Sequence, residues 1–133
     1  MRARFFALVF ACGAALSGAL AQASPDIAQW TTPNGSAVYF VAAPEIPMLD
    51  LRLVFAAGSA RDGARSGVAA LTSALLDEGS VEHTADDFHS RLDATGALLG
   101  TGVMRDMAWI SLRSLTAEPQ RATALDLLAE LLR

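Results

Sequence analysis

The amino-acid sequence predicts an α+β fold, in which helices pack on one face of a mainly antiparallel sheet. Residues 49–57 alternate side chains in the way that a strand with one buried face does. Residues 66–80 instead repeat apolar side chains at helical spacing. Two further strand-like segments, 97–103 and 107–115, lie between two later helical segments. This order of strands and helices is an α+β pattern.

The chain opens with a segment typical of a secretory signal peptide. Residues 1–4 carry two arginines, residues 5–20 are apolar, and small residues follow at 19–23. We therefore expect residues 1–23 to be a leader, and the protein to be periplasmic or secreted. An uncleaved membrane anchor is the weaker interpretation, because the apolar run is shorter than a bilayer span. Cys12, the single cysteine, lies inside this leader.

The charge of the remaining chain excludes some partners. Without the two arginines of the leader, eight arginines face fourteen aspartates and glutamates, a formal net charge of −6. An acidic balance without a basic patch argues against binding to nucleic acid or to an anionic membrane surface. We expect no nucleic-acid partner and no stable membrane span after leader cleavage.

A hairpin is predicted after the leader. Residues 24–28 look like a flexible N-terminus of the mature chain, and residues 30–32 and 36–41 look like two short strands. Asn34-Gly35 between them tolerates the positive φ that tight hairpin turns require. Residues 49–57 then form the clearest strand, and its apolar face carries Leu49, Leu51, Leu53 and Phe55.

The segment 66–80 is predicted to be one helix. Ser66 offers a hydroxyl to the unpaired N–H groups of the first turn, and Gly79 can adopt the left-handed conformation that ends a helix. The stripe that we expect to face the core consists of Val68, Leu71, Thr72, Leu75 and Leu76.

A second helix is predicted between Thr84, which can cap it, and Gly96, which ends it. Phe88 and Leu92 form its inward face. The hairpin that follows, 97–115, has a turn near residues 104–106. The side chains expected on one face of its second strand are Ala108, Ile110 and Leu112, and those on the other are Trp109, Ser111 and Arg113.

A last helix begins at Glu118-Pro119, since proline is tolerated in a first turn. Its core stripe is expected to contain Leu125, Leu128, Ala129 and Leu132, widened by Leu127 and Leu131. No Gly, Asn or Pro stop signal precedes Arg133. We therefore expect the domain to be incomplete in this chain.

The order of these segments resembles a known family. The segments that carry the resemblance are Pro33-Asn34-Gly35, the strand 49–57, Gly58-Ser59-Ala60-Arg61-Asp62, and the helix ending in Glu78-Gly79-Ser80. Together they resemble the first half of a domain in the pitrilysin/insulinase family of zinc peptidases, which includes the mitochondrial processing peptidases. The resemblance implies that residues 24–133 are the N-terminal part of such a domain.

In active members of that family the helix carries an inverted zinc motif, His-x-x-Glu-His. The matching positions in this sequence are Ala70, Ser73 and Ala74. Alanine has no donor atom for zinc, and a serine hydroxyl is a poor replacement for the carboxylate base that a hydrolytic zinc site needs. The resemblance therefore implies no catalytic residue, no metal and no cofactor in this domain.

The resemblance also implies a role and a partner. Its first implication is a non-catalytic subunit that completes the peptide-binding chamber of a zinc-bearing subunit of the same family, with zinc held by that partner or by another domain. The alternatives are a structural or assembly protein without a proteolytic role, and a peptidase whose zinc site lies in a later domain. The family's third zinc ligand, a downstream Glu, would lie beyond Arg133, and substrate-binding residues cannot be named.

Two other candidate sites have simpler interpretations. His83 and His89 are the only histidines, but they do not share the i, i+4 face of a helical zinc pair. A metal cluster with the acidic neighbours Glu82, Asp86 and Asp87 is the less favoured interpretation. We expect these residues to form a solvated loop and helix surface. Ser73 lacks a nearby His or Lys that could activate it as a nucleophile.

Overall fold

The computed structural model describes residues 25–133, so the proposed leader lies outside the described part of the chain. The chain divides into two compact units, one ending at Ala43 and the other running from Pro44 to Arg133. Between residues 25 and 133, no helix is long and apolar enough to cross a membrane.

The first unit contains a two-stranded antiparallel hairpin. Strand β1 (Ile27–Thr31) pairs with β2 (Ala37–Val41), with Ile27 opposite Val41. Gly35 in the turn has a φ of 89°, which confirms the predicted turn. The prediction of a flexible segment over residues 24–28 was wrong at its end, because strand β1 begins at Ile27 and its backbone is paired from there.

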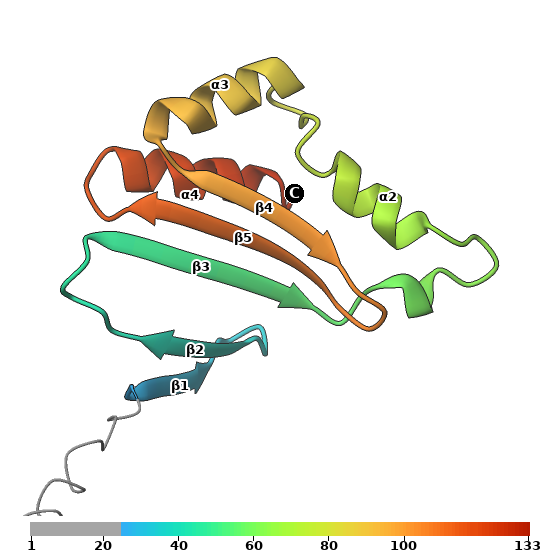
Figure 1. Cartoon of the computed structure of the whole chain (residues 1–133), viewed down its shortest axis with the longest axis horizontal. Helices are drawn as coiled ribbons and strands as arrows, with labels where there is room; N and C mark the ends of the chain where they lie inside the picture. Colours follow the sequence, from blue (N-terminus) through green and yellow to red (C-terminus); the bar gives the residue numbers. More distant parts are fainter. Residues whose placement is uncertain (1–24) are drawn as a thin grey trace, which may run out of the picture. The chain divides into compact units, whose positions relative to one another are not determined.

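The second unit is built on a three-stranded antiparallel sheet. It consists of β3 (Met48–Phe55), β4 (Leu98–Val103) and β5 (Ala108–Leu115), in the spatial order β3-β5-β4 (Figure 1). The β4–β5 hairpin matches the predicted one. The central strand, β5, places Leu112 opposite both Leu51 of β3 and Leu99 of β4. The strands that the sequence predicts therefore share one inner face, as expected.

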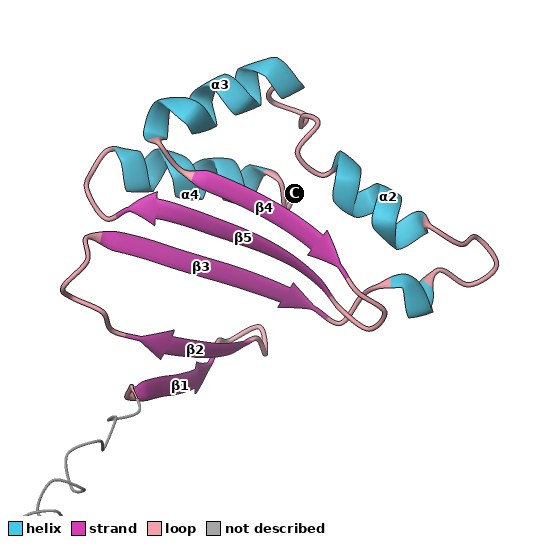
Figure 2. Cartoon of the chain, in the orientation of Figure 1, coloured by secondary structure: helices cyan, strands magenta, loops and turns pink. Residues whose placement is uncertain are grey.

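Three helices accompany this sheet: α2 (Val68–Leu75), α3 (Ala85–Thr95) and α4 (Gln120–Glu130), with a short 3₁₀ turn, η1 (Ser59–Arg61), before α2 (Figure 2). Phe88 of α3 and Ala124 of α4 are fully buried against Leu112 of the sheet and its neighbours. The core contains Phe88, Leu92, Ala97, Ile110, Leu112, Ala124, Leu127 and Leu128. An α+β fold with helices on one face of an antiparallel sheet is therefore confirmed.

The other face of the sheet carries polar and aromatic groups. Arg113 donates two hydrogen bonds to Asp50 on the neighbouring strand, at 2.6 and 2.9 Å. These bonds lower the pKa of the Asp50 carboxyl. The guanidinium of Arg52 lies 4.8 Å from the ring centre of Trp109. A Cβ at Gly102 would come within 2.1 Å of that ring, so the indole can take this position only beside a glycine.

The caps of α3 are those that the sequence predicts. Thr84 accepts a hydrogen bond from the backbone N–H of Asp87, and Gly96 ends the helix with a φ of 68°. The expected stripe of α4 needs two corrections. Leu132 is 48% exposed because the helix ends at Glu130, and Ala124, which was not predicted, is 0% exposed. Leu127 is 4% exposed and belongs to the core, as predicted.

Candidate functional site

Helix α2 is the helix that the resemblance matches to the zinc-motif helix, and its start differs from the prediction. Gly67, with a φ of 92°, precedes the helix, and Ser66 makes no capping bond. The carboxylate of Asp62 instead accepts hydrogen bonds from the N–H of Gly67 at 2.8 Å and of Ala69 at 2.9 Å. The cap therefore comes from the preceding loop, because the left-handed Gly67 turns the chain so that these N–H groups face Asp62. The helix also ends earlier than predicted, at Leu75.

The face of α2 that meets the sheet is also different from the predicted one. Val68, Leu71 and Leu75 are 43%, 60% and 55% exposed, so most of the expected core stripe is wrong. The less exposed positions are Ala69, Ser73 and Leu76. Leu76 alone, of the five predicted, packs against the core.

The physical reason is that α2 contains no charged residue in its sequence, VAALTSAL. Because apolar residues lie on almost every side of α2, no polar face marks the side that must point to solvent, and the apolar spacing does not show which side is buried. Small side chains at Ala69 and Ser73 then allow the helix backbone to approach β4, where the hydroxyl of Thr101 donates to the carbonyl of Ser73 at 3.0 Å.

The structure brings the three zinc-motif positions to one part of α2. Ala70 and Ala74 are exposed and stand four residues apart, on one side of the helix, while Ser73 is half-buried. A cavity of about 500 Å³ lies beside Ser73, and Phe55 and Trp109 are among its lining residues. Ala70 and Ala74 therefore have the spacing at which two helical side chains can share one cation, but they present only methyl groups.

Replacing Asp62 by Asn is expected to destabilise the protein by about 1 kcal/mol, because the capping carboxylate also faces the positive end of the helix. The free energy of unfolding from urea titration measures this loss. Ser66→Ala is the matched control, and we expect it to change stability by less than about 0.5 kcal/mol. A larger loss for Ser66→Ala than for Asp62→Asn would contradict the capping that the structure shows.

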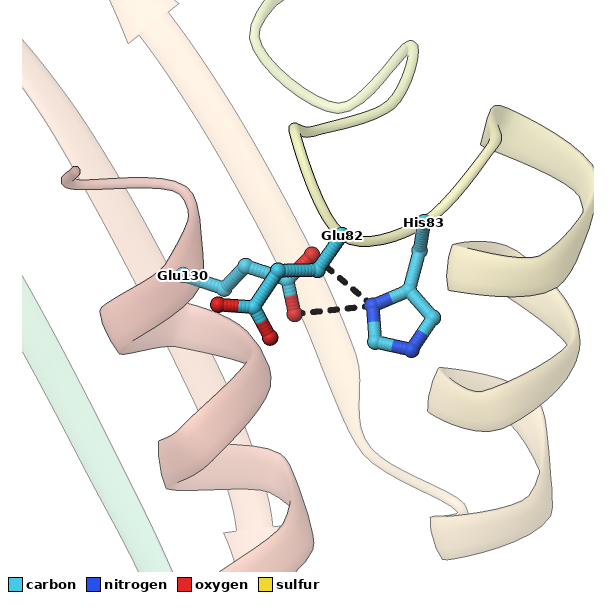
Figure 3. Close-up of side chains that lie close together, drawn as sticks. All are labelled: Glu82, His83 and Glu130. Atoms are coloured by element: carbon cyan, nitrogen blue, oxygen red, sulfur yellow. Dashed lines mark hydrogen bonds and ion pairs between the residues drawn. The ribbon is translucent and has the colours of Figure 1, made fainter.

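A second group of side chains joins the loop before α3 to the end of α4 (Figure 3). The Nδ1 atom of His83 lies 2.8 and 2.9 Å from the two carboxylate oxygens of Glu130. Ser80 donates its hydroxyl to the same carboxylate and accepts hydrogen bonds from two backbone N–H groups of its loop. The hydrogen bonds from Ser80 and His83 lower the pKa of Glu130.

The sequence draws attention to His83 but gives no sign of its partner, Glu130. Glu130 is 47 residues away, so no local spacing could have indicated it. His89 takes no part in this group; its ring meets the edge of Phe88, with 5.8 Å between the ring centres. The expectation that His83 is a solvated surface residue was wrong, because its side chain is 17% exposed and that of Glu130 only 8%.

The lowered pKa of Glu130 predicts an acid-sensitive stability. Its charged form is favoured in the folded state, so its contribution is present in full above the ordinary pKa of 4.5 and is lost as pH falls through the lower folded pKa. We expect Glu130→Gln to be less stable than the parent at pH 7, with the difference shrinking in this acidic range. Urea titrations at pH 7 and at pH values below 4.5 measure it. A difference that grows on acidification would contradict the assignment.

The fold and helix α2 together define a class of protein. It is a peptidase-type α+β domain that has no zinc ligands at the positions matched to the motif. A peptidase M16 inactive domain from Pseudomonas fluorescens is similar, with 46% identity and a TM-score of 0.77, over 80% of this chain and 26% of that chain. A protease from Helicobacter pylori shares the fold, with 19% identity and a TM-score of 0.68, over 80% of this chain and 26% of that chain. Pitrilysin also shares it, with 22% identity and a TM-score of 0.66, over 84% of this chain and 12% of that chain.

This chain is therefore a pitrilysin/insulinase-like member of peptidase family M16, and the sequence of residues 1–133 contains no His-x-x-Glu-His. It spans about a quarter of the length of the inactive M16 domain. No protein-family model and no curated protein matches the chain.

Proposed function

We propose that this non-catalytic M16-like domain is part of a periplasmic subunit that completes the peptide-binding chamber of a zinc-bearing peptidase. The observation that carries the proposal is the state of α2. Ala70, Ser73 and Ala74 lack every donor that the family's reaction requires, while the helix and the sheet beneath it are retained. A fold kept without its chemistry supports a role in binding rather than in hydrolysis.

Two features support a partner and an exported location. Val68, Leu71 and Leu75 leave an apolar strip of α2 exposed, which suits contact with another protein or with an apolar peptide side chain. The leader-like residues 1–23 support export. The similar solved structure described as an inactive M16 domain supports the absence of hydrolysis.

Affinity purification of the tagged protein from the periplasm tests this proposal. We expect a stoichiometric partner whose sequence contains His-x-x-Glu-His, identified by mass spectrometry, and a chelator-sensitive peptidase activity in the same eluate. The test variant has Leu71 and Leu75 both replaced by Glu, and we expect it to reduce recovery of the partner while the far-ultraviolet circular dichroism spectrum is unchanged. Recovery of the protein without a zinc-motif partner would favour the structural or assembly role.

A further inference from the structure

The group around His83 has the composition of a metal site. Glu82, His83 and Glu130 each offer one ligand atom, and these atoms lie within 4.8 Å of one another. One imidazole and two carboxylates suit zinc and related first-row divalent cations, whereas magnesium and calcium prefer oxygen ligands alone. Ligands at about 2.1 Å from one zinc ion stand roughly 3.4 Å apart, so only a small side-chain movement would bring all three into contact.

The second nitrogen of His83 strengthens this interpretation. Its Nε2 atom faces Asp87, with 3.5 Å between Nε2 and a carboxylate oxygen. Metal-binding histidines commonly donate the N–H of the second nitrogen to a carboxylate, which leaves the first nitrogen free to bind the cation. In the metal-free chain the Nδ1–H of His83 donates to Glu130. A cation bound there would take the place of this Nδ1 proton, and the ring would then carry its proton on Nε2, toward Asp87.

A cation can also reach the group. A cavity of about 460 Å³ is lined by Ser80, Glu82 and Glu130 among others. Glu82 is 58% exposed and pairs with Arg133 at 3.5 Å, so the ion pair that a bound cation would have to open is an exposed one. Glu130, in contrast, is held in place by the Ser80 hydroxyl.

We propose that Glu82, His83 and Glu130 bind one zinc-type divalent cation, which ties the loop between α2 and α3 to the end of α4. The site is separate from the vacated motif on α2, and it does not depend on the proposed role as a peptidase subunit. It revises the expectation from the sequence that this domain holds no metal, because Glu130 completes the ligand set only in the folded chain.

Isothermal titration calorimetry of zinc chloride into the metal-free full chain tests the proposal. We expect one zinc per chain, and an affinity at least about tenfold lower for His83→Gln and for Glu82→Gln, each of which removes one ligand. His89→Gln is the control, since it removes the other histidine, and its affinity should match the parent. Magnesium chloride should give no comparable binding heat.

Glu82→Gln is the decisive variant, because the side chain of Glu82 is exposed and we expect folding not to depend on it. Equal thermal midpoints for the metal-free variant and the metal-free parent would verify this. Zinc should raise the thermal midpoint of the parent and of His89→Gln, and should raise that of Glu82→Gln less. A parent chain that binds no zinc, or a Glu82→Gln variant that binds it as tightly as the parent, would overturn the proposal.

Discussion

Replacing both Ala70 and Ala74 by His is expected to give helix α2 a zinc affinity that the natural sequence lacks. The two positions are exposed and four residues apart, so their imidazoles would point to the same side of the helix and could share one cation. Two ligands make a weak site, and we expect a zinc affinity about tenfold or more above that of the same chain with Ala70 and Ala74 unchanged. Because alanine is the best helix former, each substitution should cost about 0.5 kcal/mol of stability.

The experiment is best done with His83→Gln also present, so that zinc bound near α4 does not contribute. Calorimetric titration with zinc measures the affinity. Ala70→His with Leu71→His is the matched control, since neighbouring positions carry the same two imidazoles in different directions. Equal affinities for the two pairs would show that the positions of the family motif are not placed on one side of α2.

Replacing Phe88 by Ala is expected to cost about 3–5 kcal/mol, the largest loss of stability among the changes considered. Its side chain is 0% exposed and lies in the cluster that joins α3, α4 and the sheet. Removing the ring leaves a cavity where three elements meet, and small domains have only about 5–15 kcal/mol of stability in total. Urea titration followed by circular dichroism measures the loss.

Leu71→Ala is the informative comparison for Phe88→Ala. Periodicity places Leu71 in the core stripe of its helix, but the structure leaves it 60% exposed. We therefore expect Leu71→Ala to change the free energy of unfolding by less than about 0.5 kcal/mol. A loss of several kcal/mol for Leu71→Ala would mean that α2 packs by the face that the sequence predicts.

The two ends of α3 and the alternation of β5 were the most predictable features of the fold. Thr84 and Gly96 act on backbone groups a few residues away, so their roles in bounding α3 can be inferred from local sequence. The alternation along β5 was equally informative, because Arg113 on one face and Leu112 on the other leave only one face to bury. In both cases the structure follows from residues that are close together in the sequence.

The start of α2 could not be predicted with the same rules. Ser66 occupies a favourable sequence position for a cap, but Asp62 provides it because the loop folds back on the helix. Which side of α2 faces the sheet was also undecided, since an uncharged helix has more than one apolar side. The hydrogen bond from Thr101 to the backbone of Ser73 forms only when β4 is in place.

The sequence alone determined that this chain has no zinc ligands at Ala70, Ser73 and Ala74, because the presence of a donor atom is a property of each residue. Only the tertiary structure decided that His83 meets Glu130, because their contact joins segments 47 residues apart through the packing of α4 against α3 and the sheet. The residue type at each position fixes which donor atoms are present, whereas the distance between groups far apart in the sequence depends on which faces of the helices and strands are buried.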